Sequence, residues 1–488
     1  MISFKLLKIN SMKNIILVTI IFFQTTILFS QGIEIIVNDD TQFGFSRPRI
    51  TLLENDVPFV LWGKPGGSPK VYGAKMIGNS FSVPVQIVPD SMNPRVGGLD
   101  GPNIVSKKDS IFVAWGNQDA MNHHVFLSRS IDGGNSFGSA IQTDSVNMGV
   151  NIEYPGVSIS NDGTLGIYFI KSDASWNNPT QSLITSYDGG NTFSKDTAVN
   201  TFSPGLPCEC CQGSMEMQDS NWVFYYRNNV SNIRNTYSLV STDYGSNFDG
   251  VYELDDVDWF IQSCPSSGPE GHINGDNSFT AWMSKGTGNS RILYSSVNMS
   301  TGTASTATMI DPSVASNVVQ NYTSVAGSGD TIAVVWQDNR YLASHVFSSI
   351  SIDGGQSFMG TTLISDTTIL MSYTSIDVAF ANGIFHYVWK NNNKIFYKSI
   401  TMSILLSAAN KVSATNDFNL YPNPTTSELT IDSDIEIEKI SILNITGKLI
   451  REVKQESNII NVTDLDKGIY FIKINGKDKS AVMKFVKQ

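Results

Sequence analysis

The stretch SIFVAWGNQDAMNHHVFLSRSIDGGNSF, residues Ser110 to Phe137, contains the pattern that decides the fold. It opens with an apolar run that ends at Trp115 and continues with an alternating segment, His124 to Ser130. Alternation and aromatic residues are typical of strands. The Asp-Gly-Gly that follows favours a turn, because glycine reaches positive φ and aspartate bonds to nearby backbone. The stretch therefore predicts two antiparallel strands followed by a tight turn.

The apolar run with an aromatic end occurs seven times at nearly equal spacing. Its last residues are Trp62, Trp115, Phe169, Tyr226, Trp282, Trp336 and Trp389. The intervals are 53, 54, 57, 56, 54 and 53 residues, and each has room for four short strands. Four strands per repeat of this length are typical of a propeller blade. We predict an all-β, seven-bladed β-propeller over residues 31–410. A six-bladed ring with an irregular module is the alternative, because two repeats are degenerate.

The ends of this region predict how the ring closes. The seventh repeat supplies only three strands before the chain leaves the pattern. Gly32 to Asn38 reads GIEIIVN and has no other partner, so we expect it to be the outer strand of the last blade. Such a strand covers an exposed sheet edge and fastens the ring.

Four turns share one motif. They read SIDGGNSF, SYDGGNTF, STDYGSNF and SIDGGQSF, with the aspartates at Asp132, Asp188, Asp243 and Asp353. This motif is the Asp-box, and its four copies resemble those of the sialidase-like (BNR repeat) propellers. We expect the aspartates to accept backbone N–H bonds across the turn. A group repeated round a ring is not a single active centre, so the motif indicates fold rather than catalysis.

The N-terminus has the pattern of an export signal. Lys5, Lys8 and Lys13 precede an apolar run from Ile15 to Phe29, which is followed by the small residue Ser30. We predict a signal peptide over residues 1–30; a membrane anchor is the alternative. No transmembrane segment is expected in the mature chain.

Residues 417–488 leave the repeat, after an expected linker at 411–416. Alternating strands between turn residues predict a small Ig-like β-sandwich. The segment resembles the C-terminal sorting domain of type IX secretion substrates in the Bacteroidetes. The resemblance rests on Tyr421, Pro422, Asn423 and Pro424, on Gly468-Ile469-Tyr470, and on Lys484-Phe485-Val486-Lys487. It implies recognition by the type IX secretion machinery, removal of the domain, and a protein that is secreted or attached to the outer surface.

The charge excludes one class of partner. The chain has 33 basic and 44 acidic residues, a formal net charge of -11. A general nucleic-acid binder needs a basic surface for the phosphate backbone, so no nucleic acid is expected as a partner.

The four cysteines gather on one face of the predicted ring. Cys208, Cys210 and Cys211 precede the first strand of blade 4, and Cys264 precedes that of blade 5. Turns at these positions lie opposite the Asp-box turns. An even cysteine count in an exported protein predicts disulfides, with Cys264 bonded to the cluster. The alternative is a thiolate site for copper or zinc, with Met215 and His272 as further soft ligands; no other cofactor is required.

Loops of other blades project to the same face and predict a ligand site. They contribute Arg227, Arg340, Asp338, Trp176, His123 and His124. The function expected is a glycan- or protein-binding module with no assignable catalytic residue. The alternative is an exo-sialidase or related glycoside hydrolase, since Phe45 to Ile50 loosely resembles the first element of sialidases. Their Tyr-Glu nucleophile pair has no assignable counterpart here.

Overall fold

The computed structural model describes residues 34–39, 46–118, 123–145, 149–341, 343–365, 375–405, 418–433, 435–444, 449–453, 458–476 and 480–488. The predicted signal peptide and the predicted linker lie outside these residues. The predicted all-β class is confirmed, because the described elements are strands apart from a 3-10 turn, η2 (Glu54–Asp56), and helical residues 402–405.

The described residues before 402 form seven antiparallel sheets, numbered here 1 to 7 along the chain. Sheet 1 contains β2 (Ser46–Leu52), β3 (Pro58–Lys64), β4 (Lys70–Ile77), β5 (Ser80–Phe81) and β6 (Val85–Gln86). Sheet 2 contains β7 (Asn103–Lys107), β8 (Ser110–Gly116), β9 (Val125–Ser130) and β10 (Ile141–Gln142). Sheet 3 contains β11 (Val150–Ile159), β12 (Leu165–Asp173), β13 (Thr180–Ser186) and β14 (Thr197–Ala198). Sheet 4 contains β15 (Leu206–Pro207), β16 (Ser214–Gln218), β17 (Asn221–Asn229), β18 (Thr236–Ser241) and β19 (Gly250–Glu253). Sheet 5 contains β20 (Glu270–Asn274), β21 (Asn277–Ser284), β22 (Arg291–Asn298), β23 (Thr303–Ala304) and β24 (Thr308–Met309). Sheet 6 contains β25 (Gln320–Ser328), β26 (Thr331–Asp338), β27 (His345–Ser351) and β28 (Thr362–Leu363). Sheet 7 contains β29 (Ile376–Ala381), β30 (Ile384–Asn391), β31 (Lys394–Thr401) and β1 (Ile35–Asp39).

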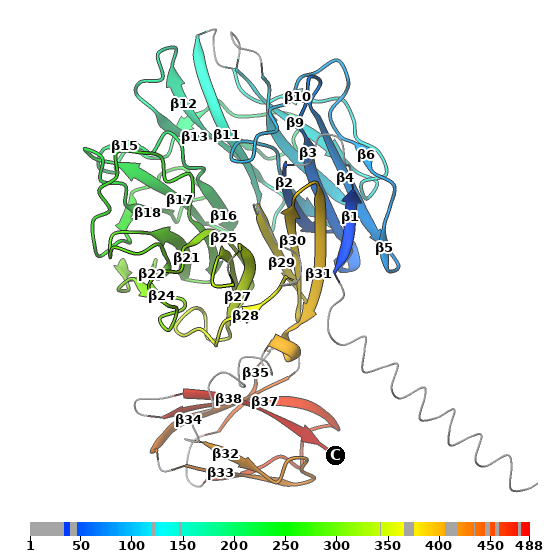
Figure 1. The fold of residues 1–488 in the computed structure, drawn as a ribbon, viewed down its shortest axis with the longest axis vertical. Helices are drawn as coiled ribbons and strands as arrows, with labels where there is room; N and C mark the ends of the chain where they lie inside the picture. The colour runs from blue at the N-terminus through cyan, green and yellow to red at the C-terminus, as the bar shows by residue number, and fades with distance from the viewer. Residues whose placement is uncertain are drawn as a thin grey trace, which may run out of the picture.

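The seven sheets are arranged in a closed ring (Figure 1). The innermost strands β2, β7, β11, β16, β20, β25 and β29 contact one another in this order, and β29 contacts β2 again. Each sheet is therefore covered on both faces by its neighbours, which explains why its central strands are apolar on both sides.

The ring is fastened by pairing between its first and its last strand in the sequence, as predicted. β1 pairs antiparallel with β31, with Ile35 opposite Tyr397 and Asn38 opposite Ile395. Val37 of β1 is 7% exposed and belongs to a core cluster shared with sheet 1. The outer strand of sheet 7 thus comes from the start of the described chain.

The repeated aromatic residues form the core between the sheets. Trp62, Trp115, Trp282 and Trp336 are fully buried. Phenylalanines of the turn motif add to this packing across sheet boundaries: the ring of Phe137, after β9, lies 6.2 Å from that of Phe59 in sheet 1. The regular spacing of the sequence is therefore a packing requirement, since each sheet inserts equivalent side chains against the next.

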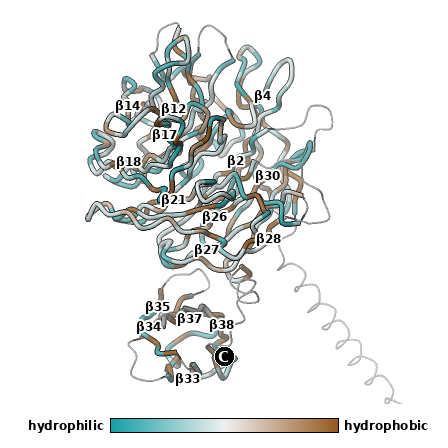
Figure 2. The backbone as a smooth tube through the Cα atoms, turned by 60° about the vertical axis from the view of Figure 1, so that its left-hand side comes forward, coloured by the Kyte–Doolittle hydropathy of each residue, from teal (hydrophilic) through white to brown (hydrophobic). Residues whose placement is uncertain are grey.

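The tail is a second body with its own core, drawn below the ring in Figure 2. Its sheets contain β32 (Asn419–Tyr421), β33 (Glu428–Asp432) and β36 (Ile459–Asn461), and β35 (Leu449–Val453), β34 (Ile437–Leu443), β37 (Gly468–Gly476) and β38 (Ser480–Lys487). Leu429, Ile440 and Phe485 are buried between them. The tail touches the ring through Lys473, whose Nζ lies 2.9 Å from a carboxylate oxygen of Asp353.

Candidate functional site

The repeated aspartates hold turns together. An Asp132 carboxylate oxygen accepts the Ser136 N–H at 3.0 Å, and the other accepts the Ser136 hydroxyl at 2.6 Å. The Ser130 hydroxyl also donates to Asp132, at 2.7 Å. The Ser136 hydroxyl is the main cause that lowers the pKa of Asp132 to about 2. Asp188, Asp243 and Asp353 make the equivalent bonds, so the geometry agrees with a structural role for all four.

The substitution Asp132→Ala should lower the free energy of unfolding by about 1 to 3 kcal/mol, because it leaves turn donors without their acceptor. Chemical denaturation of the purified chain measures this loss. Asp162→Ala, which alters an aspartate outside the motif, is the comparison. Equal stability of wild type and Asp132→Ala would contradict the structural role.

Two hydrogen bonds locate the turns on opposite faces of the ring. Gly133, in the turn after β9, donates to the Asp109 carbonyl in the turn between β7 and β8. Cys208 instead donates to the carbonyl of Arg227, at the far end of β17. The cysteines therefore lie on the face opposite the repeated turns, as predicted, and this face is called the cysteine face below.

Two predicted ligand residues, Arg227 and Arg340, are engaged within the protein. The Arg227 side chain is fully buried and donates to the carbonyls of Arg234 and Met283, both at 2.7 Å. Arg340 is paired with Asp338, itself buried, and lies 2.8 Å from Asp311. Both side chains therefore have structural partners, and their role toward a ligand stays a prediction. Their loops were placed on the right face, but neighbouring loops and sheets capture the side chains.

Two other predicted residues do meet at the mouth of the ring. The rings of His123 and Trp176 lie 5.9 Å apart, centre to centre, and Trp176 is 49% exposed. His123 Nδ1 lies 3.2 Å from Arg95. His124 points elsewhere, because its Nδ1 lies 2.8 Å from the buried carboxylate of Asp144. His123 and Trp176 thus form an aromatic pair between sheets 2 and 3, and the Arg95 beside it is itself paired with Asp100 at 2.6 Å.

A cavity of about 400 Å³ lies at the centre of the cysteine face. First strands of several sheets, and the loops that precede them, line it. The side chains relevant to ligand chemistry are Arg47, Arg49, Tyr154, Glu270, Tyr322 and Lys390. Sequence reasoning missed most of them: Arg47 and Arg49 stood in the Phe45 to Ile50 element, but nothing marked the tyrosines or Lys390.

Three of the first strands depart from regular pairing at this cavity. Arg47, Tyr154 and Tyr322 have φ of 47°, 54° and 54°, a region that non-glycine residues rarely adopt. Each lies where the pairing of β2, β11 or β25 shifts register. A bulge redirects a side chain at the cost of local strain, and such strain gathers at functional sites. The bulges therefore mark the cavity as the place where the repeat is broken.

The cavity is rich in positive charge. Burial, and next the charge of Arg49, lower the pKa of Arg47 to about 9, and burial lowers the pKa of Lys390. The one carboxyl group among the described lining residues is that of Glu270, which accepts the Val325 N–H at 3.0 Å. Burial and then Asp377 raise the pKa of Glu270. Arg47 donates to the Leu99 carbonyl at 2.7 Å and Arg49 donates to the Ile376 carbonyl at 3.3 Å. These partners are neutral, so three basic groups against one lining carboxyl favour an anion here.

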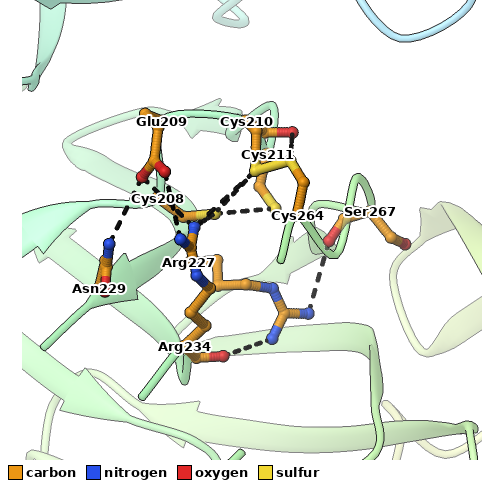
Figure 3. Close-up of a disulfide and its surroundings, with 9 residues drawn as sticks. All are labelled: Cys208, Glu209, Cys210, Cys211, Arg227, Asn229, Arg234, Cys264 and Ser267. Atoms are coloured by element: carbon orange, nitrogen blue, oxygen red, sulfur yellow. Dashed lines mark hydrogen bonds and ion pairs between the residues drawn. A yellow bond between two sulfur atoms is a disulfide. The ribbon is translucent and has the colours of Figure 1, made fainter. Parts of the chain in front are cut away.

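The sulfur atoms form a compact group (Figure 3), and Cys210 of this group lines the cavity. Cys210 and Cys264 form a disulfide, which joins the loops before β16 and β20 as predicted. Cys208 and Cys211 are buried free thiols. The hydrogen bond with Cys211, then a hydrogen bond with the Cys210 backbone and the charge of Arg234, lower the pKa of Cys208.

The two further ligands expected for copper or zinc are not beside the sulfurs. Met215 packs in the core cluster between sheets 3 and 4. The His272 ring lies 3.2 Å from Glu216. Among the described residues, Cys208, Cys210 and Cys211 form a group whose sulfurs lie within 4.8 Å of one another. The copper or zinc site stays a prediction.

Comparison with known families identifies the tail. Residues 419–488 match the secretion system C-terminal sorting domain. The predicted tail is confirmed, and with it export to the medium or cell surface by type IX secretion. Among the described residues, no helix is long and apolar enough to cross a membrane.

Comparison of the fold finds enzymes that act on carbohydrates. An ulvan lyase of polysaccharide lyase family PL25 has a TM-score of 0.50 and 12% identity, over 76% of this chain and 96% of that one. A Hadza microbial sialidase has a TM-score of 0.45 and 11% identity, over 76% and 69%. The α-L-arabinanase of Penicillium chrysogenum has a TM-score of 0.40 and 13% identity, over 76% and 99%. At these identities the likeness concerns the fold alone. No sequence among the curated proteins matches this one.

Proposed function

We propose that the exported ring is a seven-bladed, sialidase-like Asp-box propeller that binds an anionic carbohydrate in its central cavity. The carrying observation is the grouping of Arg47, Arg49 and Lys390 in one cavity of a chain whose net charge is -11. Seven sheets in a closed ring support seven blades over the six-bladed alternative. Pairing with a sugar carboxylate or sulfate suits the arginines, since guanidinium groups bind such oxyanions with two parallel bonds.

The neighbouring side chains suit a sugar. Tyr154 and Tyr322 line the same cavity and supply apolar ring faces with hydroxyl groups at their ends. The volume of about 400 Å³ is in the range of small-molecule sites. The exposed Trp176 and the nearby His123, which are not among the residues that line the cavity, form a further aromatic surface.

The cavity favours binding over glycoside hydrolysis. Most glycosidases use two carboxyl groups on either side of the scissile bond. Among the described residues that line the cavity, Glu270 alone has a carboxyl group, and its oxygen bonds to sheet 6. A glycosidase of this kind therefore has less support than a binding role. Sialidases use a tyrosine nucleophile and are an exception to this pattern, so the assay below tests the exo-sialidase alternative directly.

A glycan array with the purified exported chain tests this proposal. We expect binding to glycans that carry carboxylate or sulfate, weakening as salt is raised, and no binding to their neutral counterparts. A fluorogenic sialoside assayed beside the array should give no turnover. Turnover would favour the exo-sialidase, and selective binding of neutral glycans or of a protein would contradict the anionic-sugar proposal.

Arg49→Gln should weaken the best array ligand by about 10- to 100-fold, because a hydrogen bond to a charged group contributes roughly 1.5 to 3 kcal/mol. Titration calorimetry measures this change. Arg129→Gln removes an arginine at the outer part of sheet 2, where it bonds to the Gly189 carbonyl, and is the matched control. Equal affinity of Arg49→Gln and wild type would contradict the assignment of the cavity.

A further inference from the structure

The four cysteines combine one disulfide with two free thiols at bonding range. Cys208 Sγ lies 3.1 Å from Cys211 Sγ and 3.6 Å from Cys210 Sγ, a sulfur of the disulfide (Figure 3). Cys264, the other half of that disulfide, is exposed, whereas Cys208 and Cys211 are buried. One thiol therefore stands between two possible sulfur partners.

The surroundings favour Cys208 as the nucleophile. Arg234 Nη1 lies 2.9 Å from Cys208 Sγ and 3.8 Å from Cys210 Sγ. A cation at this distance stabilises the thiolate, which is the form that attacks a disulfide. The same guanidinium is held by Glu209, 3.2 Å away, so its position is fixed by a second contact.

Cys208 and Cys211 also have the backbone geometry of a local disulfide. The Cys211 N–H bonds to the Cys208 carbonyl at 3.4 Å, which closes a turn. Residues at the ends of such a turn have Cα atoms less than about 7 Å apart, close to the range that a disulfide spans.

We propose that these cysteines form an intramolecular thiol–disulfide exchange site, which moves the disulfide from Cys210–Cys264 to Cys208–Cys211. In the first step the Cys208 thiolate attacks Cys210 Sγ; the Cys208–Cys210 bond forms, and Cys264 leaves as a thiolate. In the second step Cys211, having lost its proton, attacks Cys208 Sγ; the Cys208–Cys211 bond forms and Cys210 leaves. The Cys211 proton ends on one of the two released thiolates. One disulfide and two thiols are present before and after, so no outside oxidant or reductant is required.

The exchange acts on the wall of the central cavity. Cys210 lines that cavity, as do Gln212 on its own loop and Ser267 on the loop of Cys264. The original disulfide ties these two loops across sheets 4 and 5, over a sequence separation of 54 residues. The new disulfide lies within one loop, so the exchange releases the tie. The effect on the cavity rests on the proposed function, whereas the exchange itself is tested without any ligand.

Timed alkylation of Cys264 tests the exchange. The full chain, purified without reductant, is incubated with iodoacetamide, and labelled cysteines are located by mass spectrometry. We expect two thiols per chain after denaturation, no stoichiometric copper or zinc, and progressive labelling of Cys264. Cys208→Ser should slow the labelling of Cys264 at least tenfold, because it removes the attacking sulfur.

Cys211→Ser is the matched control. It removes an equally buried thiol but leaves the first step intact, so Cys264 should still be labelled and a Cys208–Cys210 bond should accumulate. The proposal is overturned if the protein has no free thiol, which means two disulfides. It is also overturned if four thiols are released with one bound metal ion, or if Cys208→Ser leaves the labelling of Cys264 unchanged.

Discussion

Deletion of residues 34–39, which removes β1, is expected to lower the free energy of unfolding by about 5 kcal/mol or more. The strand supplies its backbone pairs to β31 and buries Val37 in the cluster between sheets 7 and 1. Each lost ladder bond costs roughly 0.5 to 1.5 kcal/mol, and each exposed aliphatic side chain roughly 1.5 to 3 kcal/mol. The deletion also bares the edge of β31, which invites association between chains. Denaturant titration and light scattering measure the two effects.

Two substitutions on the same strand separate the fastening role from a general effect of altering the N-terminus. Val37 is 7% exposed and its neighbour Ile36 is 46% exposed. Val37→Asp buries a charge between the sheets and should reproduce much of the loss, whereas Ile36→Asp should change stability little. A synthetic peptide of residues Gly32 to Asp39, added to the deleted chain, should restore part of it. An unchanged denaturation midpoint after the deletion would mean that the ring closes without β1.

Features that the sequence predicted are those set by repetition or by local chemistry. The burial of Trp62 and Trp115 could be predicted because every sheet must place an equivalent side chain at an equivalent depth. β1 was expected because the seventh repeat lacked a strand and a sheet edge needs a partner. The turn at Asp132 follows from the bonding of residues four positions apart. The first and the third of these inferences rest on the repeat and on local sequence, and the second rests on counting the strands of each repeat.

The central cavity was not predicted, because it arises where the repeat fails. Tyr154 and Tyr322 enter it through bulges in which one residue interrupts the alternation of β11 and β25. One added residue in a strand leaves no periodic signal, and its φ depends on the neighbouring sheets. Lys390 lies near the end of β30 in sheet 7, and Arg47 lies in β2 of sheet 1. The two residues are far apart in the sequence, so only closure of the ring brings them into one cavity.

Arg227 shows the same limit for a single side chain. The position of its loop followed from the strand order, but the direction of the guanidinium depends on the carbonyl of Met283 in sheet 5. The pairing of β21 with β20 and β22 sets where that carbonyl lies. Arg227, which the sequence placed among the ligand-face candidates, therefore bonds sheet 4 to sheet 5.

Arg227→Ala is expected to lower the free energy of unfolding by about 3 to 5 kcal/mol. It leaves buried carbonyls of Arg234 and Met283 without a donor, each at a cost of roughly 1 to 3 kcal/mol, and opens a cavity beneath the ring of Trp259, which lies 5.1 Å from the guanidinium carbon. The charge of Arg227 also offsets the burial that raises the pKa of Asp255, so its loss makes that buried carboxylate more costly.

Thermal and denaturant unfolding of Arg227→Ala, Arg227→Lys and Arg129→Ala measure this role. Lysine keeps a charge but lacks the planar fork that reaches two carbonyls at once, so Arg227→Lys should recover only part of the loss. Arg129, which is only partly buried, donates to the Gly189 carbonyl at 2.6 Å and to the Asn191 side-chain oxygen at 2.9 Å, where water can replace it, so its removal should cost less than about 1 kcal/mol. If Arg227→Ala were as stable as wild type but failed to bind the array ligand, Arg227 would be a ligand residue of the mouth after all. If it unfolds as expected, the junction of sheets 4 and 5 depends on a buried cation whose bonds span the two sheets, beside the loops that the cysteines join.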